Sequence, residues 1–228
     1  DVQSQLIKLL QAGIIDYQKY GLPRVYHGII KRSCLLKVKQ QTGHFLGGLS
    51  PDIYATISLA CIVESHYVID YPFSIAGACP ASTSVASKQG KHAGKLESAP
   101  HFINRGIYEW EKCIPQYYSV ETIWAETALK ALKEIQHENI YSMFNSNKFI
   151  LSSILINRNQ ILKLAILKSL ELYKHTGDNK YYYWVKLFGY TIWFVFRKSL
   201  VYFLRKVKKI HREKEKVGMN NVHSLKEA

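Results

Sequence analysis

A single carboxylate, Asp52, stands between a glycine turn and an apolar run in the stretch GHFLGGLSPDIYATISLACIV (residues 43–63). An Asp at a helix start accepts backbone N–H bonds and interacts well with the helix dipole, so a helix cap is one interpretation. A general base is the other, because Gly47 and Gly48 allow a ligand close to the backbone and Pro51 stiffens the turn. A strand-to-helix junction also lies at the sheet edge where ligands usually bind. Residue types alone leave both interpretations open.

Other residues could line a site around this carboxylate. His27 could lie beside Asp52 in a ligand site, although a histidine packed at a strand end explains it equally well. Tyr26 could stack on the flat face of a ligand, although a chain with 16 Tyr uses most of them for packing. The small, polar and basic segment 78–100 predicts either a mobile lid or a solvated loop. Its candidates for contacts to a polar or anionic ligand are Ser82, Ser84 and Lys88.

Helical and strand-like patterns alternate over the first hundred residues, which predicts half of an α/β domain. The expected order is helix 1–20, strand 24–31, helix 34–42, helix 51–63 and strand 66–77. Ser119 is expected to cap a further helix over residues 120–136, with a buried apolar stripe. Glu121 and Glu126 lie on that helix, and capping and surface pairing explain both of them.

The net charge of +14 is concentrated near the end of the chain. From Arg197 to Lys216 there are nine Lys or Arg against two Glu, which points to an anionic partner. Helical spacing places one apolar face opposite a basic face from residue 192 onward, as in helices that lie in the plane of a membrane surface. A helix docked on its own domain is the alternative, and nucleic acid is a weaker one because no binding motif accompanies the charge. The longest uncharged run, ten residues over 187–196, is shorter than the ~20 that cross a bilayer.

The four cysteines are scattered without a CxxC pair, which argues against a disulfide framework or a zinc site. Thiols in a reducing compartment are the expected state. A metal role for His92 or His101 is a minor alternative.

Four segments in order carry a resemblance: LPRVYHGIIKR, GGLSPDIYATISLA, YVIDYPFSIAGACPASTSVAS and YSVETIWAETALKAL. Their order and spacing over residues 22–132 resemble the second half of family 2 glycosyltransferases from bacterial surface-polysaccharide pathways. The resemblance implies an α/β fold, namely a partial GT-A (Rossmann-like) half-domain followed by an α-helical C-terminal region. The expected division is a half-domain over 1–100, a connecting helical segment over 101–140 and a basic helical tail over 141–228.

The resemblance also implies a function and a site. Asp52 would be the general base of an inverting transfer from a nucleotide-sugar to a polysaccharide or glycolipid acceptor, in a protein on the inner face of the cell membrane. Family members hold Mg²⁺ or Mn²⁺ with an Asp-x-Asp motif in the other half, and this chain has no such motif. We therefore expect either a fragment of a longer enzyme or a partner chain that supplies the donor site. The alternative is a non-catalytic remnant or accessory protein that binds a membrane or partner through its tail.

Overall fold

The computed structural model describes residues 1–26, 28–69, 71, 92–103 and 105–176, with scattered positions between 185 and 206. The chain divides into unit 1, Asp1–Asp178, and unit 2, Asn179–Ala228. The boundaries expected at residues 100 and 140 stay a prediction. The candidate site residues that lie outside the described positions are His27, Ser82, Ser84 and Lys88.

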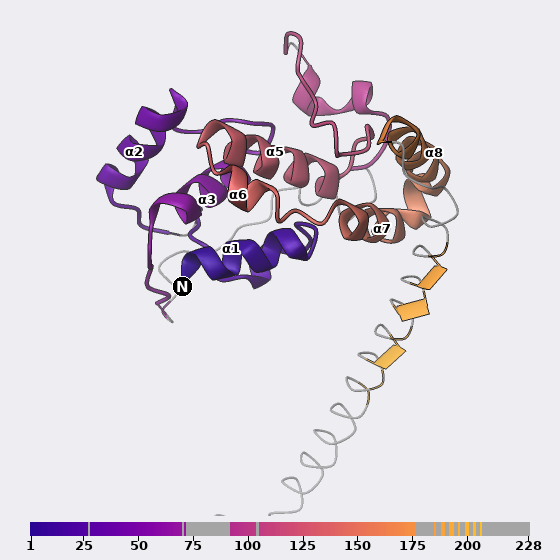
Figure 1. Ribbon diagram of the computed structural model, residues 1–228, viewed down its shortest axis with the longest axis horizontal. Coiled ribbons are helices and arrows are strands. Elements are labelled where there is room, and N and C mark those ends of the chain that lie inside the picture. The colour runs from indigo at the N-terminus through magenta and orange to yellow at the C-terminus, as the bar shows by residue number, and fades with distance from the viewer. Residues whose placement is uncertain are drawn as a thin grey trace, which may run out of the picture. The chain divides into compact units, whose positions relative to one another are not determined.

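Unit 1 is built from helices, with α3 and α5 side by side at its centre (Figure 1). The helices are α1 (Val2–Gln11), α2 (Arg32–Thr42), α3 (Pro51–Ile62), α5 (Val120–Glu134), α6 (Glu138–Tyr141), α7 (Ser146–Ile156) and α8 (Arg158–Thr176). Three 3-10 turns accompany them, namely η1 (Tyr17–Lys19), η2 (Leu96–Ser98) and η3 (Pro100–Phe102). Extended pairing within the described residues is limited to an antiparallel bridge between Gly94 and Tyr118. A mixture of helix and extended chain is compatible with this arrangement, but the described residues form no Rossmann-like sheet.

The predicted strands are not formed in the described part of their ranges. Residues 24–26 and 28–31 have no strand structure up to the start of α2, and the same holds for 66–69 and 71. β-Branched and aromatic residues favour a strand only when a neighbouring strand pairs its backbone and covers its side chains. Ile29 and Tyr67 instead have side chains that are 93% and 94% exposed.

The first helix is shorter than its apolar periodicity predicts, since α1 ends at Gln11 rather than near residue 20. Gly13 adopts a left-handed φ of +77°, and a Cβ there would lie 2.7 Å from the backbone N of Phe149. Ile14 and Asp16 also have positive φ, so the chain turns sharply where α7 packs against it. Tertiary packing has overridden the helical pattern here.

The predictions for the next two helices are confirmed. α2 ends at Gly43, whose φ of +83° is the left-handed conformation of a helix C-cap. α3 begins with Pro51 in its first turn, where the missing N–H is not needed. Helix α3 is buried on most of its circumference because α1, α2 and α5 pack around it.

Helix α5 begins as predicted at a Ser119 cap. The Ser119 hydroxyl accepts from the Thr122 backbone N–H at 3.2 Å, and the Thr122 hydroxyl accepts from the Ser119 backbone N–H at 2.9 Å. This reciprocal capping box fixes the start of the helix. The apolar stripe is buried as predicted, with Ile123, Ala128 and Leu132 at most 3% exposed.

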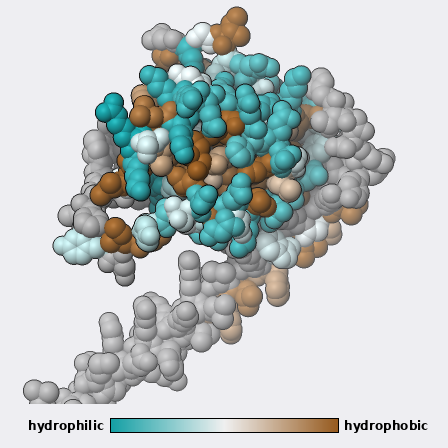
Figure 2. Space-filling model, turned by 60° about the vertical axis from the view of Figure 1, so that its left-hand side comes forward, coloured by the Kyte–Doolittle hydropathy of each residue, from teal (hydrophilic) through white to brown (hydrophobic). Residues whose placement is uncertain are grey.

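Unit 2 is helical at the positions that are described between 185 and 206. Five large apolar side chains there have between 46% and 70% of their surface exposed, and we call them the apolar row: Phe188, Ile192, Phe196, Leu200 and Phe203. Figure 2 shows hydrophobic side chains between hydrophilic ones on one face of unit 1. Over the described residues, no helix combines the length and apolar character that a membrane crossing needs.

Candidate active site around Asp52

Asp52 lies in the first turn of α3 with a half-buried side chain. One carboxylate oxygen accepts a hydrogen bond from the Ser50 hydroxyl at 2.6 Å, and the other accepts from the Tyr17 hydroxyl at 3.4 Å. Within the described part of the chain, its hydrogen bonds therefore come from hydroxyl groups and not from helix backbone amides. The helix dipole favours an acidic side chain at this position, but the capping hydrogen bond of the structural interpretation is not made.

Tyr17 comes from η1, far from Asp52 in sequence, and is held by the aromatic core. Its ring packs edge-on against Trp124 of α5, with centroids 4.9 Å apart and planes at 84°. Burial, and next the nearby Asp52 carboxylate, raise the pKa of the Tyr17 phenol. The phenol therefore stays protonated and remains a donor to Asp52 at neutral pH.

The glycine turn Gly47–Gly48 is shaped by packing against α5. Gly48 has a φ of +63°, and a Cβ there would lie 2.6 Å from Cγ2 of Thr127. The Thr127 hydroxyl in turn accepts from the backbone N–H groups of Leu49 and Ser50, at 3.1 and 3.2 Å. One buried threonine thus fixes the two residues that lead into the Asp52 turn.

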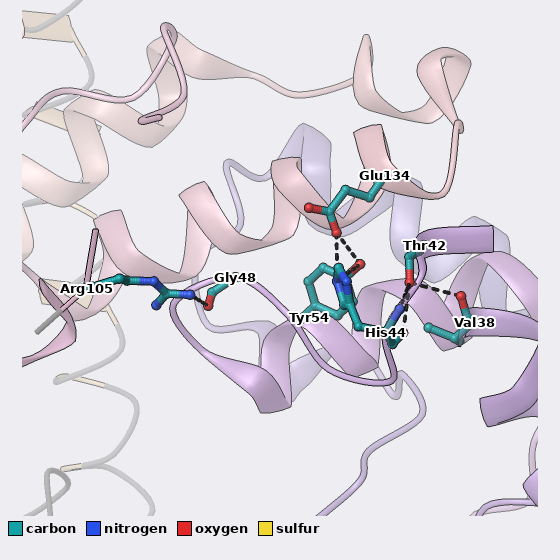
Figure 3. A network of polar contacts seen from close by, with 7 residues as sticks. All are labelled: Val38, Thr42, His44, Gly48, Tyr54, Arg105 and Glu134. Carbon is teal, nitrogen blue, oxygen red and sulfur yellow. Dashed lines mark hydrogen bonds and ion pairs between the residues drawn. The ribbon is translucent and has the colours of Figure 1, made fainter. Parts of the chain in front are cut away.

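Arg105 also hydrogen-bonds to the turn. Its guanidinium donates to the Gly48 carbonyl at 3.0 Å (Figure 3), and its side chain is exposed. The guanidinium also lies 5.2 Å from the ring centroid of Tyr108, as a cation over an aromatic face. Arg105 is therefore a positive group within reach of solvent next to the glycine turn.

A second polar cluster lies beside the turn, between α3 and α5 (Figure 3). The Tyr54 hydroxyl donates to Glu134, and His44 Nε2 lies 3.0 Å from both the Tyr54 hydroxyl oxygen and a Glu134 carboxylate oxygen. A Cβ on Gly47 would lie 2.5 Å from His44 Nε2 and 2.8 Å from the Tyr54 ring. This packing gives Gly47 a structural reason to lack a side chain.

Glu126 of α5 is fully buried, contrary to the surface role expected from the sequence. Its Oε1 accepts from the Tyr108 hydroxyl at 2.6 Å, while its buried Oε2 has no hydrogen-bond partner among the described residues. Burial raises the pKa of Glu126 to about 7, against the opposing effects of the Tyr108 hydrogen bond and the Lys130 charge. Glu126 is thus a carboxyl group poised between its neutral and charged forms at physiological pH.

The structure brings together three of the residues that the sequence singled out, Asp52, Gly47 and Gly48. Tyr26 is 61% exposed, and it is not one of the two hydroxyl donors to Asp52. The remaining candidates, His27 and the loop residues Ser82, Ser84 and Lys88, lie outside the described positions.

Sequence reasoning missed the groups that hold the candidate site. Ser50 carried a readable signal, since a hydroxyl two residues before a carboxylate can turn back to it. Glu126 carried one as well, because it stands three residues from both Ile123 and Leu129 on the buried face of α5. Tyr17 and Arg105 reach the site from distant segments, and no local pattern announces them.

The described residues do not fit a divalent cation. They contain no group of three or more His, Cys, Asp or Glu side chains arranged to bind one. The Asp52 carboxylate is occupied by hydroxyl donors instead of facing a second carboxylate. The metal that the resemblance implies has no ligand set in this part of the chain.

Comparison with known protein families, with characterised proteins and with solved structures finds no match to this chain.

Proposed function

We propose that this chain is the acceptor-side part of an inverting glycosyltransferase in which Asp52 is the general base. The observation that supports it most is the setting of Asp52, a half-buried carboxylate aimed by the Ser50 and Tyr17 hydroxyls instead of by helix amides. Ser50 holds the N-cap position of α3, so Asp52 can act on the helix through its dipole but is not the capping residue. The four family-like segments supply the reaction class.

The chemistry asked of Asp52 is one proton transfer. As an acceptor hydroxyl oxygen bonds to the anomeric carbon of the donor sugar, its proton passes to the Asp52 carboxylate. The bond from the anomeric carbon to the nucleoside diphosphate breaks on the opposite face, and the diphosphate leaves with the electron pair. Attack and departure on opposite faces invert the anomeric configuration, as in inverting glycosidases with an alcohol in place of water.

Two features of the surrounding turn suit this role. Thr127 and Arg105 both hydrogen-bond to the backbone of residues 48–50, so the backbone leading to Asp52 is fixed before an acceptor arrives. The Arg105 guanidinium also supplies an exposed positive charge beside the turn, where a leaving diphosphate would be stabilised. No step is assigned to a metal ion, because the described residues offer no ligands for one.

A non-catalytic accessory protein is the second candidate function. The exposed apolar row of unit 2 is compatible with it, because a binding protein needs such an interaction surface and needs no catalytic group. The two candidates differ at Asp52, which the accessory role does not need.

Binding of simple acceptor sugars separates the two candidates. Saturation-transfer NMR with a panel of methyl glycosides is expected to show binding to the full chain. Asp52→Asn is expected to weaken that binding roughly tenfold or more, because a hydrogen bond to a charged group becomes a neutral one. Asp16→Asn is the matched control, since Asp16 is an exposed carboxylate that pairs with Lys19.

Either of two results would count against the enzyme: no glycoside binds, or Asp52→Asn binds as the unaltered chain does. Calorimetric titration with uridine diphosphate, with and without Mn²⁺, then tests the donor side separately. Metal-dependent nucleotide binding would show that the chain forms a donor site from residues outside the described positions. Glycoside binding without nucleotide binding is the result expected of an acceptor-side part.

A further inference from the structure

The apolar row of unit 2 follows one side of a helix. Its members are spaced by four, four, four and three residues, which is the spacing of side chains on a single helical face. All five are exposed, with Phe188 at 70% and Phe196 at 66%. Five large apolar side chains in a continuous row are more than the scattered exposed residues normal for a soluble surface, and such rows mark interaction sites.

The charge around this row is strongly positive. Lys206 is exposed and follows Phe203 by three residues, so it ends the apolar row on the same helical face. In the sequence, nine Lys or Arg against two Glu fall between Arg197 and Lys216. A partner that fits this segment must therefore present an apolar layer beneath an anionic one. A bilayer containing anionic lipid has that layering.

Aromatic side chains at the start of the segment support the same partner. Trp193 is 45% exposed next to the apolar row, and Trp is enriched where a polypeptide meets the boundary between headgroups and acyl chains. The segment does not suit single-stranded nucleic acid, because its aromatic residues are segregated from its cations instead of interleaved with them. A helix that docks in a protein groove would need the apolar row but not the concentration of positive charge.

We infer that unit 2 lies in the plane of an anionic lipid surface, with the apolar row inserted at the level of the acyl chains and the cations toward the headgroups. The inference does not depend on Asp52 and holds for either candidate function. Anionic lipid is concentrated in the cytoplasmic leaflet of cell membranes, so this attachment would place the chain on the inner face of the cell membrane.

Co-sedimentation of the full chain with lipid vesicles tests the inference. We expect binding to vesicles of phosphatidylglycerol and phosphatidylcholine, much weaker binding to pure phosphatidylcholine, and a decrease as salt is raised. Phe196→Asp and Phe203→Asp should each lower the partition coefficient roughly tenfold or more, because each removes an inserted ring and adds a repelled charge. Ile29→Asp is the matched control, a 93% exposed apolar residue of unit 1 that should leave binding unchanged.

Three results would overturn the inference. The unaltered chain could stay in the supernatant with anionic vesicles, or both row variants could bind as it does, which would leave charge alone as the cause. A single-stranded RNA oligonucleotide could also displace the chain fully from vesicles in competition, which would identify nucleic acid as the preferred partner. Asp52→Asn should bind vesicles like the unaltered chain, so loss of this attachment and loss of the proposed transferase activity are separate outcomes.

Discussion

Glu126→Gln is expected to remove a pH-dependent cost that the buried carboxyl group imposes on the fold. The side chain is fully buried in α5 and accepts one hydrogen bond, from Tyr108, while its second oxygen has no partner among the described residues. Gln keeps the shape and can still accept from Tyr108 through its carbonyl oxygen. The substitution therefore removes the titration and little else.

The magnitude follows from linkage between proton binding and folding. Burial raises the pKa of Glu126 from 4.5 to about 7 in the folded chain, so between these values the folded state holds a proton that the unfolded state has lost. The free energy of unfolding then falls by ~1.4 kcal/mol for each pH unit as pH rises through this window. The whole effect is about 3 kcal/mol, and it is constant above the folded pKa.

Urea unfolding of the unaltered chain and of Glu126→Gln from pH 4 to pH 8, in steps of about half a unit, measures how the free energy of unfolding of each depends on pH. His101 titrates in the same range with the opposite sign, because burial, and then His92, lower the pKa of its imidazole and penalise the folded state in acid. Both proteins contain His101, so subtracting one unfolding free-energy profile from the other cancels the His101 contribution and leaves that of Glu126. The charges that face Glu126 are Lys130, Glu111 and Arg105, and all three are kept in the variant.

The free energy of unfolding of Glu126→Gln minus that of the unaltered chain should rise from pH ~4.5 to ~7 and stay constant above that. Glu138→Gln on α6 controls for removal of a negative charge, since Glu138 is exposed. A difference profile that is flat over the whole range would refute the reasoning. So would a profile with the same slope in the Glu138→Gln control.

Three further substitutions test how the site is held, each by urea unfolding at neutral pH. Gly48→Ala should destabilise the fold by about 1 to 3 kcal/mol, because φ is +63° and the new Cβ would lie 2.6 Å from Thr127. Gly106→Ala is its control and should cost about 1 kcal/mol or less, because a Cβ at Gly106 would meet open space. Thr127→Val should cost about 1 to 3 kcal/mol, because two backbone N–H groups lose their acceptor while the side-chain shape is kept. Ser119→Ala should cost ~1 kcal/mol by removing one half of the α5 capping box, and a change below a few tenths would contradict that account.

The helix ends that the sequence predicted are those set by interactions between neighbouring residues. The start of α3 at Pro51, the end of α2 at Gly43 and the start of α5 at Ser119 each depend on a residue acting on its immediate neighbours. The end of α1 could not be predicted in this way. It is set by the close approach of Phe149 to Gly13, and that contact exists only after the chain has folded.

The strand predictions were wrong for a related reason. A helix satisfies its backbone hydrogen bonds within its own segment, so its sequence pattern is sufficient to locate it. A strand depends on a second segment, and residues 24–26 and 28–31 have no such neighbour among the described residues. The β-branched and aromatic residues of this segment predicted a strand, but residue types could not show whether a pairing segment was present, and Ile29 is 93% exposed.

The candidate site shows the same limit at the level of side chains. Its carboxylate could be singled out from the Pro51–Asp52 pair and the glycine turn, but that turn is fixed by α5, more than seventy residues further along the chain. Thr127 fixes the turn through two backbone amides, and Glu134 of the same helix holds Tyr54 beside it. Glu126, next to Thr127, is a buried carboxyl group whose protonation changes the charge inside that helix. The direction of a carboxylate that looks local in the sequence therefore depends on Tyr17 and on a distant helix that fixes the turn around Ser50. That dependence explains why residue types alone left a cap and a base as alternatives.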